Sequence, residues 1–213
     1  MSGIPTIHVL AGVNGAGKSS VGESIFKEEG SKVFNPDTIA TRIRALHPEI
    51  SRSMANAHGW QIGKALLEQA IAGKRDYRFE TTLGGNTIPA LLEKAAKEGH
   101  RVNVWFCGLA SPELHIRRVQ KRAARGGHDI PVEKIHERWH SSRENLVRLL
   151  PCIHHLRLYD NSFEADPVEG RKPRPVLLLE MREQTITAPE DLSGAPEWAQ
   201  PILAAGMLLH RGR

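Results

Sequence analysis

The feature that most constrains this chain is a phosphate-loop motif that begins at Gly12. Residues 12–19 read GVNGAGKS, which matches the pattern G-x-x-x-x-G-K-[ST] in full. The apolar run at residues 6–11 predicts a buried strand before the motif, and residues 20–29 predict a helix after it. A glycine loop between a strand and a helix is the setting in which this motif binds nucleotide phosphates. The expected nucleotide-binding residues are Gly12, Val13, Asn14, Gly15, Ala16, Gly17, Lys18, Ser19 and Ser20.

The chemistry of this loop indicates ATP and Mg²⁺ as cofactors. Successive backbone N–H groups and the positive end of the helix dipole face one concavity, which suits phosphate oxygens. Lys18 is expected to reach the β- and γ-phosphates, and the hydroxyl of Ser19 is expected to ligate the metal. The spacing fits ATP and GTP equally.

Strands and helices are expected to alternate along the rest of the chain. Strands are predicted at residues 32–34, 77–83, 102–109, 155–160 and 176–180, and helices at residues 38–46, 51–73, 86–97, 111–124 and 131–149. This alternation predicts an α/β fold of the P-loop NTPase or kinase type, with a doubly wound parallel sheet of about five strands, helices on both faces and a helical lid. We expect a single domain over residues 1–213, with a core at about 4–162 and an irregular extension at 163–213.

The composition is that of a globular protein with an excess of positive charge. The formal net charge of +5 suits an anionic partner, and nucleotides and phosphosugars satisfy this as well as nucleic acids do. No apolar run approaches the length of a membrane span, and the start lacks a signal-peptide pattern. Cys107 and Cys152 show no paired spacing, which is typical of free thiols in a reducing compartment. We therefore expect a cytoplasmic location and no membrane partner.

The remaining motifs favour phosphoryl transfer to a small molecule. Motors and GTPases usually carry an acid at the end of a buried strand, but the apolar run at residues 102–109 ends in Cys-Gly-Leu. The guanine signature Asn-Lys-x-Asp is also absent from the sequence. A kinase needs a carboxylate that activates the acceptor hydroxyl, and Asp37 follows the second predicted strand, at the sheet edge where ligands bind. A helix cap is the equal alternative for Asp37.

Two further groups are candidates for substrate contacts. Glu80, near the end of the third predicted strand, is placed to bind acceptor hydroxyls or to support Mg²⁺, with a solvated strand-end acid as the alternative. Arg118, Arg122 and Arg125 fall on one stripe of a predicted helix just before Gly126-Gly127. Such a stripe fits a lid over the transferring phosphate or, equally, a solvated basic face.

A literal zinc-protease pattern, H-E-x-x-H, occurs at residues 136–140. The pattern lacks the downstream third ligand of its extended form, and Arg138 within it fits the phosphate-binding scheme. We interpret these histidines as surface or packing residues and expect no zinc site.

Taken together, the motifs resemble the zeta-toxin family of P-loop kinases. The residues that carry the resemblance run in the family's order and are the phosphate loop at 12–19, Asn35-Pro36-Asp37, the FETTL segment at 79–83, Arg118 to Arg125, the GGHDIP segment at 126–131, Arg138, the SRENL segment at 142–146 and the YDNS segment at 159–162. The GGHDIP segment is similar to that of the family's chromosomal branch.

This resemblance implies ATP-dependent phosphorylation of a small molecule, with a nucleotide sugar such as UDP-N-acetylglucosamine as the candidate acceptor. It implies that Asp37 is the catalytic base, that Glu80 and Thr82 bind the acceptor, and that Arg125 and Arg138 clamp phosphate. Lys18 and Ser19 keep the roles given above, and Arg118 and Arg122 are candidate helpers in the lid. The resemblance also makes an antitoxin protein a candidate partner. The alternatives are a polynucleotide or RNA-directed kinase, and a toxin component whose effect depends on a partner protein.

Overall fold

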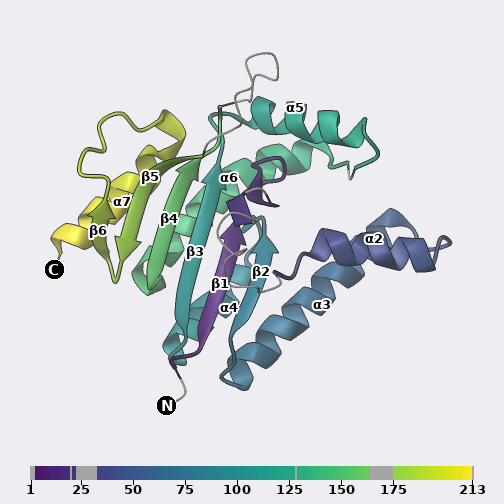
Figure 1. The fold of residues 1–213 in the computed structure, drawn as a ribbon, viewed down its shortest axis with the longest axis horizontal. Helices are drawn as coiled ribbons and strands as arrows, with labels where there is room; N and C mark the ends of the chain where they lie inside the picture. Colours follow the sequence, from purple (N-terminus) through teal and green to yellow (C-terminus); the bar gives the residue numbers. More distant parts are fainter. Residues whose placement is uncertain (1–2, 20, 23–32, 128, 164–174, 213) are drawn as a thin grey trace.

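The computed structural model describes residues 3–19, 21–22, 33–127, 129–163 and 175–212. Within this part of the chain, six strands form one sheet in the order β2-β1-β3-β4-β5-β6 (Figure 1). The strands are β1 Thr6–Ala11, β2 Tyr77–Thr81, β3 Arg101–Gly108, β4 His155–Asp160, β5 Val176–Arg182 and β6 Thr185–Ala188. The helices are α2 Pro36–Leu46, α3 Arg52–Ala72, α4 Thr87–Lys97, α5 Pro112–Ala123, α6 Val132–Leu149 and α7 Gln200–Arg211.

The sheet is parallel from β2 to β4 and antiparallel beyond it. Strand β1 pairs in parallel with both β2 and β3, and β3 pairs in parallel with β4. These pairings confirm the α/β fold with a mostly parallel sheet. The sheet has six strands, where about five were expected: β5 matches the strand predicted at residues 176–180, and β6, which pairs with it as a hairpin, was not predicted. In the segment after residue 162, where helix was expected in part of residues 188–207, the structure has helix α7.

The turn between β5 and β6 explains why the sequence did not reveal this hairpin. Glu183 and Gln184 both adopt left-handed backbone angles, with φ of +46° and +65°. Such turns match the twist of the strands and usually carry Asn or Gly, which this turn lacks. The familiar sequence signal for a hairpin is therefore missing here.

The strand predicted at residues 32–34 is reduced to a single bridge at Phe34. Its backbone N–H donates to the Arg78 carbonyl at 2.9 Å, and the Glu80 N–H donates to the Phe34 carbonyl at 2.8 Å. Lys32 lies outside the described residues, as does most of the helix expected at residues 20–29. The bridge fastens the chain to the outer edge of β2, so the start of α2 is held next to Glu80.

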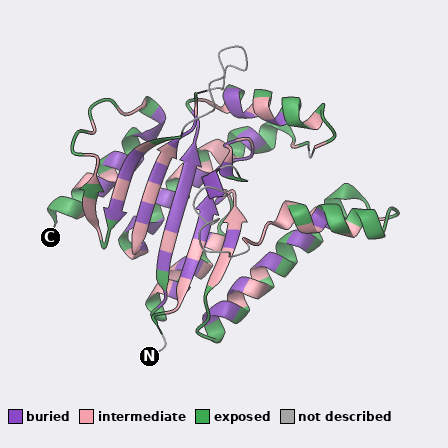
Figure 2. Ribbon diagram, in the orientation of Figure 1, coloured by how far each residue is buried: buried purple, intermediate pink, exposed green. Residues whose placement is uncertain are grey.

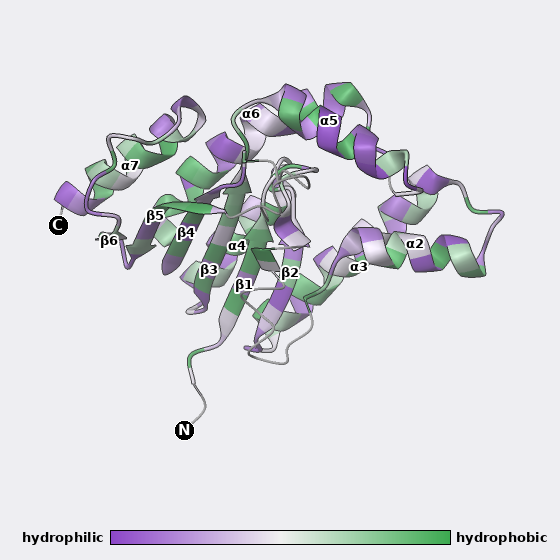
Figure 3. Cartoon of the chain, turned by 45° about the horizontal axis from the view of Figure 1, so that its top comes forward, coloured by the Kyte–Doolittle hydropathy of each residue, from purple (hydrophilic) through white to green (hydrophobic). Residues whose placement is uncertain are grey.

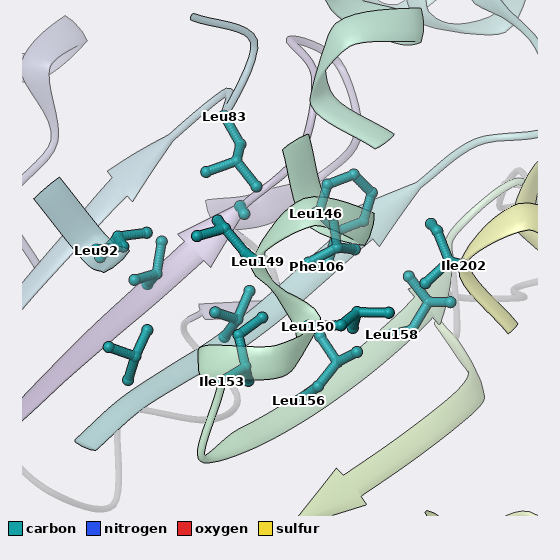
Figure 4. Packing of buried hydrophobic residues seen from close by; sticks show 14 of the residues in the cluster. Leu83, Leu92, Phe106, Leu146, Leu149, Leu150, Ile153, Leu156, Leu158 and Ile202 are labelled. Atoms are coloured by element: carbon teal, nitrogen blue, oxygen red, sulfur yellow. The ribbon is translucent and has the colours of Figure 1, made fainter. Parts of the chain in front are cut away.

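The main core lies between one face of the sheet and helices α4, α6 and α7, together with the C-terminal part of α3 (Figure 4). Strand β3 is buried over almost its whole length, as a central parallel strand should be (Figure 2). Leu92 of α4, Leu146 of α6 and Ile202 of α7 are fully buried in the same cluster as the side chains of β3. Burial of such side chains stabilises a fold by about 2 kcal/mol each, so this face anchors the strand ends that carry the site.

Helices α2 and α3 form a pair that stands beyond the β2 edge of the sheet (Figure 1). They approach closely because α3 carries Gly59, where a Cβ atom would lie only 2.5 Å from the Pro36 carbonyl oxygen. Helix α2 is mostly exposed, with Ala40 as its one fully buried residue (Figure 2). Helix α5 shows alternating hydrophilic and hydrophobic bands in Figure 3, and packs on α6.

Candidate active site

The phosphate loop has a backbone shape that only glycine can adopt at two of its positions. Gly12 has φ of +139°, and a Cβ atom there would lie 2.2 Å from the Cys107 carbonyl oxygen. Gly17 has φ of +81°, and a Cβ atom there would lie 2.2 Å from Asn161 Nδ2. Left-handed angles and such short approaches are both prohibitive for other residues. The motif therefore fixes the loop against the carboxyl end of β3 and the segment after β4.

Two side chains from distant parts of the chain hold the loop from behind. Asn161 Nδ2 donates to the Ala16 carbonyl at 2.8 Å, and His115 Nδ1 donates to the Asn14 carbonyl at 2.9 Å. Burial lowers the pKa of His115 to about 4, which keeps its ring neutral with the proton on Nδ1. Neither residue was predicted to support the loop, although Asn161 lies in the YDNS segment. No local pattern marks His115.

Lys18 is buried and already engaged with protein oxygens. Its Nζ donates to the Gly12 carbonyl at 2.7 Å and lies 3.4 Å from Glu80 Oε1. Glu80 sits near the end of β2, so the register of β1 and β2 brings the two charges together. At this distance the negative charge of Glu80 offsets much of the electrostatic potential of the Lys18 ammonium group.

Asn35 connects the start of α2 to the end of β2. Its Oδ1 accepts from the Asp37 N–H at 2.8 Å and so caps α2, and its Nδ2 donates to Glu80 Oε2 at 3.0 Å. The cap of this helix is therefore Asn35, and Asp37 is a residue of its first turn. The side chain of Asp37 lines the same cavity as Lys18 and Glu80.

Arg138 reaches the cavity from α6. Its Nη1 donates to Asn14 Oδ1 at 2.8 Å, and Gly84 packs closely enough that a Cβ there would lie 2.7 Å from Arg138 Cγ. Burial lowers the pKa of Arg138, and the negative charge of Asp37 opposes this. The Arg138 guanidinium is therefore hydrogen-bonded to the phosphate loop through Asn14 and interacts electrostatically with Asp37.

These groups surround a cavity of about 370 Å³ at the carboxyl ends of β1 and β2. Such a position, at the carboxyl edge of a parallel sheet, is where open α/β folds bind ligands. The polar and charged residues that line it are Asn14, Lys18, Asn35, Asp37, Asn56, Lys64, Glu80, Thr81, Thr82, Thr87, Lys134, Glu137 and Arg138. The size fits a small-molecule ligand.

The structure places the other predicted site residues in different settings. Thr82 lines the cavity, and its Oγ1 accepts from the Gly84 N–H at 3.4 Å. Ser19 is exposed at the start of the helix that follows the loop, and Ser20 lies outside the described residues.

Arg118 and Arg122 of α5, and Arg125 just beyond its end, are not among the residues that line this cavity. Arg118 Nη2 donates to the Ser162 carbonyl at 3.4 Å, while Arg122 and Arg125 are exposed. The stripe therefore lies near the segment after β4 rather than at the cavity wall. Its role as a lid stays a prediction.

The H-E-x-x-H pattern lies on α6 and is used for surface contacts. Glu137 pairs with Lys134 at 2.6 Å, and the His140 ring packs edge-on against Trp139. Among the described residues, no group of three or more His, Cys, Asp or Glu side chains is arranged to hold a metal ion.

Cys107 and Cys152 are free thiols. No described helix is long and apolar enough to cross a membrane.

Comparison with known proteins places this fold and loop among P-loop proteins. The family model for the zeta toxin matches residues 2–165. A Haemophilus influenzae protein is 27% identical over 128 residues, which cover 60% of this chain and 88% of that protein.

Two solved structures show the same fold at low sequence identity. The crystal structure of AvrRxo1-ORF1:-ORF2 with ATP has a TM-score of 0.66 at 14% identity, covering 95% of this chain and 63% of that one. The match therefore covers less than two thirds of the length of the AvrRxo1 chain. A chain of the PezAT chromosomal toxin-antitoxin system of Streptococcus pneumoniae has a TM-score of 0.55 at 15% identity, covering 81% of this chain and 75% of that one. With a family match that covers well over half of its residues, the chain belongs to the zeta toxin family.

Proposed function

We propose that this protein is a kinase that transfers the γ-phosphoryl group of ATP to a hydroxyl of a small metabolite. The observation that carries the proposal is that Asp37 lines the same cavity as Lys18 of the phosphate loop. A loop for the donor phosphates and a carboxylate for the acceptor hydroxyl therefore face one space. This arrangement is what direct transfer between two bound substrates requires.

The donor side is built for triphosphate. The backbone N–H groups of the loop would hold the phosphate oxygens, and Lys18 would exchange its contacts with Gly12 and Glu80 for the β- and γ-phosphates. Ser19 offers a hydroxyl beside Lys18, and Glu80 offers a carboxylate near it, which are the hard oxygen ligands that Mg²⁺ prefers. When bound, Mg²⁺ would neutralise charge on the β- and γ-phosphates.

In the transfer step, Asp37 acts on the acceptor while the phosphate loop holds ATP. The acceptor oxygen forms a bond to the γ-phosphorus, the bond from that phosphorus to the β–γ bridging oxygen breaks, and ADP leaves with the electron pair. The proton of the acceptor hydroxyl passes to the Asp37 carboxylate. Arg138, held by Asn14 on the loop side, is placed to stabilise negative charge on the transferring group.

The acceptor we propose is a nucleotide sugar such as UDP-N-acetylglucosamine, with Glu80 and Thr82 as its ligands in the cavity. The family membership supports this choice, and the polar and aromatic lining of the cavity, including Phe34 and Trp60, is compatible with it. PezAT is a toxin-antitoxin system and AvrRxo1-ORF1:-ORF2 is a complex, which supports an antitoxin-like protein as a partner of this chain.

The experiment is a transfer assay with γ-labelled ATP, Mg²⁺ and either UDP-N-acetylglucosamine or a metabolite extract. We expect a new phosphorylated compound, identified by mass spectrometry, that is absent when Lys18→Ala protein is used. A protein that binds ATP but labels no metabolite in either mixture would contradict the proposal. Labelling of added RNA or DNA instead would favour a polynucleotide kinase.

A further inference from the structure

A second cavity lies beside the active-site cavity, between α2, α3 and the end of the α5 segment. It has a volume of about 270 Å³. Its lining residues are Ala40, Thr41, Arg44 and Ala45 of α2, Arg52 and Asn56 of α3, and Gly126 and Gly127. Asn56 lines both cavities, so the two spaces share a wall. We refer to this space as the outer cavity.

The charges of the outer cavity are not balanced. Among the described residues that line it, Arg44 and Arg52 are the charged ones, and neither makes a hydrogen bond or an ion pair with any other described residue. In the active-site cavity, by contrast, the lysines are paired: Lys18 with Glu80, Lys64 with Glu68, and Lys134 with Glu137. The outer cavity therefore presents two guanidiniums that attract an anion.

The position of Arg52 strengthens this conclusion. Arg52 is the first residue of α3, and the first turn of that helix contains no acidic residue. A cation at the positive end of a helix dipole is unfavourable, and most helices place an acid there instead. Helices α2, α5 and α6 have an acid there, namely Asp37, Glu113 and Glu133, whereas α4 and α7 have neither an acid nor an arginine at that end. An anion bound beside Arg52 would be favoured by the guanidinium and by the helix end together.

The spacing along α2 connects this cavity to the chemistry. Asp37, Thr41 and Arg44 fall at i, i+4 and i+7, so they share one stripe of the helix. Seven residues advance a helix by roughly 10 Å. A ligand whose hydroxyl lies near Asp37 could thus place a second group beside Arg44, past Asn56.

We propose that Arg44 and Arg52 form an anion subsite that binds a phosphate, or a group of similar charge, carried by the acceptor about 10 Å from the hydroxyl that is phosphorylated. The inference rests on the proposed kinase function in one respect, that the acceptor binds near Asp37. Binding of an anion by the two arginines can be measured without any catalysis.

The test is a calorimetric titration with inorganic pyrophosphate while a Mg²⁺ complex of a non-hydrolysable ATP analogue saturates the phosphate loop. We expect one pyrophosphate to bind in addition to the analogue, and the R44A/R52A double variant to weaken this binding by about 10- to 100-fold. Arg42, an exposed arginine of α2 that does not line the outer cavity, gives the matched control. The R42A variant should bind within about twofold of the wild type.

A second titration distinguishes an anion on the acceptor from a free anion, with UDP and uridine as probes under the same conditions. We expect UDP to lose affinity in the double variant and uridine to be unaffected. Three results would each overturn the subsite: no pyrophosphate binding alongside the ATP analogue, equal pyrophosphate binding by the double variant, or a UDP affinity that is the same in the double variant and the wild type. Unchanged affinity for the ATP analogue verifies folding, and the transfer assay above reports separately on the kinase function.

Discussion

The two walls of the active-site cavity are built on different principles. On the wall that the phosphate loop forms (the loop wall), Lys18 and Asn14 are each only 6% exposed. Asn14 is held by hydrogen bonds from His115 and Arg138, and Lys18 is held by the Gly12 carbonyl and by its ion pair with Glu80.

On the opposite wall, which α2 and α3 form (the helical wall), Trp60 of α3 is 40% exposed and α2 is mostly exposed (Figure 2). Only the C-terminal part of α3 reaches the main core, through Leu67, Ala70 and Ile71. Buried, fully bonded walls hold one geometry, whereas exposed helix pairs have low local stability. We infer that the loop wall fixes the phosphates and that the helical wall adapts to the acceptor.

The largest effect should come from removing a charge on the loop wall. We expect Lys18→Ala to lower the transfer rate by roughly 1,000-fold, because a preorganised cation next to the transferring phosphate is lost. Lys64→Ala is the matched change on the helical wall, where Lys64 pairs with Glu68 at 2.7 Å. It should change the rate by less than about threefold. Equal losses of transfer rate in the two variants would contradict the proposed difference between the two walls.

Glycine substitutions test the same contrast through stability. Gly12→Ala places a Cβ against the backbone of Cys107 at a left-handed φ, so we expect a loss of more than about 3 kcal/mol in unfolding free energy. Gly63→Ala on α3 places a Cβ 2.7 Å from Phe34 Cε1, a half-buried ring that can turn aside. The helix propensity gained there should hold the net change within about 1 kcal/mol.

Urea unfolding monitored by circular dichroism measures both glycine variants. A Gly12→Ala protein as stable as the wild type would show that the loop has another backbone shape.

The pH dependence of stability tests the buried support of the loop wall. Because the pKa of His115 is lowered to about 4 in the folded protein, the unfolded chain takes up a proton first as the pH falls. The contribution of His115 to stability is therefore complete above about pH 6.5 and is lost progressively down to about pH 4, by up to about 3 kcal/mol.

The measurement compares unfolding free energies of the wild type and His115→Asn at pH 7.5 and 4.5. The asparagine amide can still donate to the Asn14 carbonyl but does not titrate, so its loss over this range should be smaller. If both proteins lost the same unfolding free energy between pH 7.5 and 4.5, His115 would not be the group responsible for the pH dependence.

A smaller effect is expected at the junction between the walls. Asn35→Ala removes the cap of α2 and the hydrogen bond to Glu80, and should cost about 1 kcal/mol of stability. Asn35→Ser keeps a capping oxygen and should recover most of that stability, yet it lacks the amide that holds Glu80. Thermal unfolding with a transfer assay on both variants separates the two roles, and a serine variant as unstable as the alanine variant would argue against capping.

Much of the fold and part of the site could be predicted from the sequence, because the signals are local. The phosphate loop, strand β3 and the ends of α3, α4 and α6 follow from runs of apolar residues, caps and glycines within a few positions of each other. The supports of the loop could not be predicted in this way. His115 and Asn161 act on residues 101 and 145 positions earlier, so only the folded chain brings them together.

The role of Asp37 shows the same limit at shorter range. Asn35 and Asp37 are both good caps, and the choice between them depends on the bridge of Phe34 to β2, which turns Asn35 toward Glu80. With the cap assigned to Asn35, the Asp37 carboxylate is available to the cavity.

The central claim is that Asp37 takes the proton of the acceptor, and a single comparison tests it most directly. Transfer rates and ATP-analogue affinities are measured for the wild type and Asp37→Asn, an exchange that keeps the size of the side chain but removes its basicity. The account predicts a rate lowered by about 100- to 10,000-fold with nucleotide affinity nearly unchanged. A variant that transfers phosphate at the wild-type rate would contradict it.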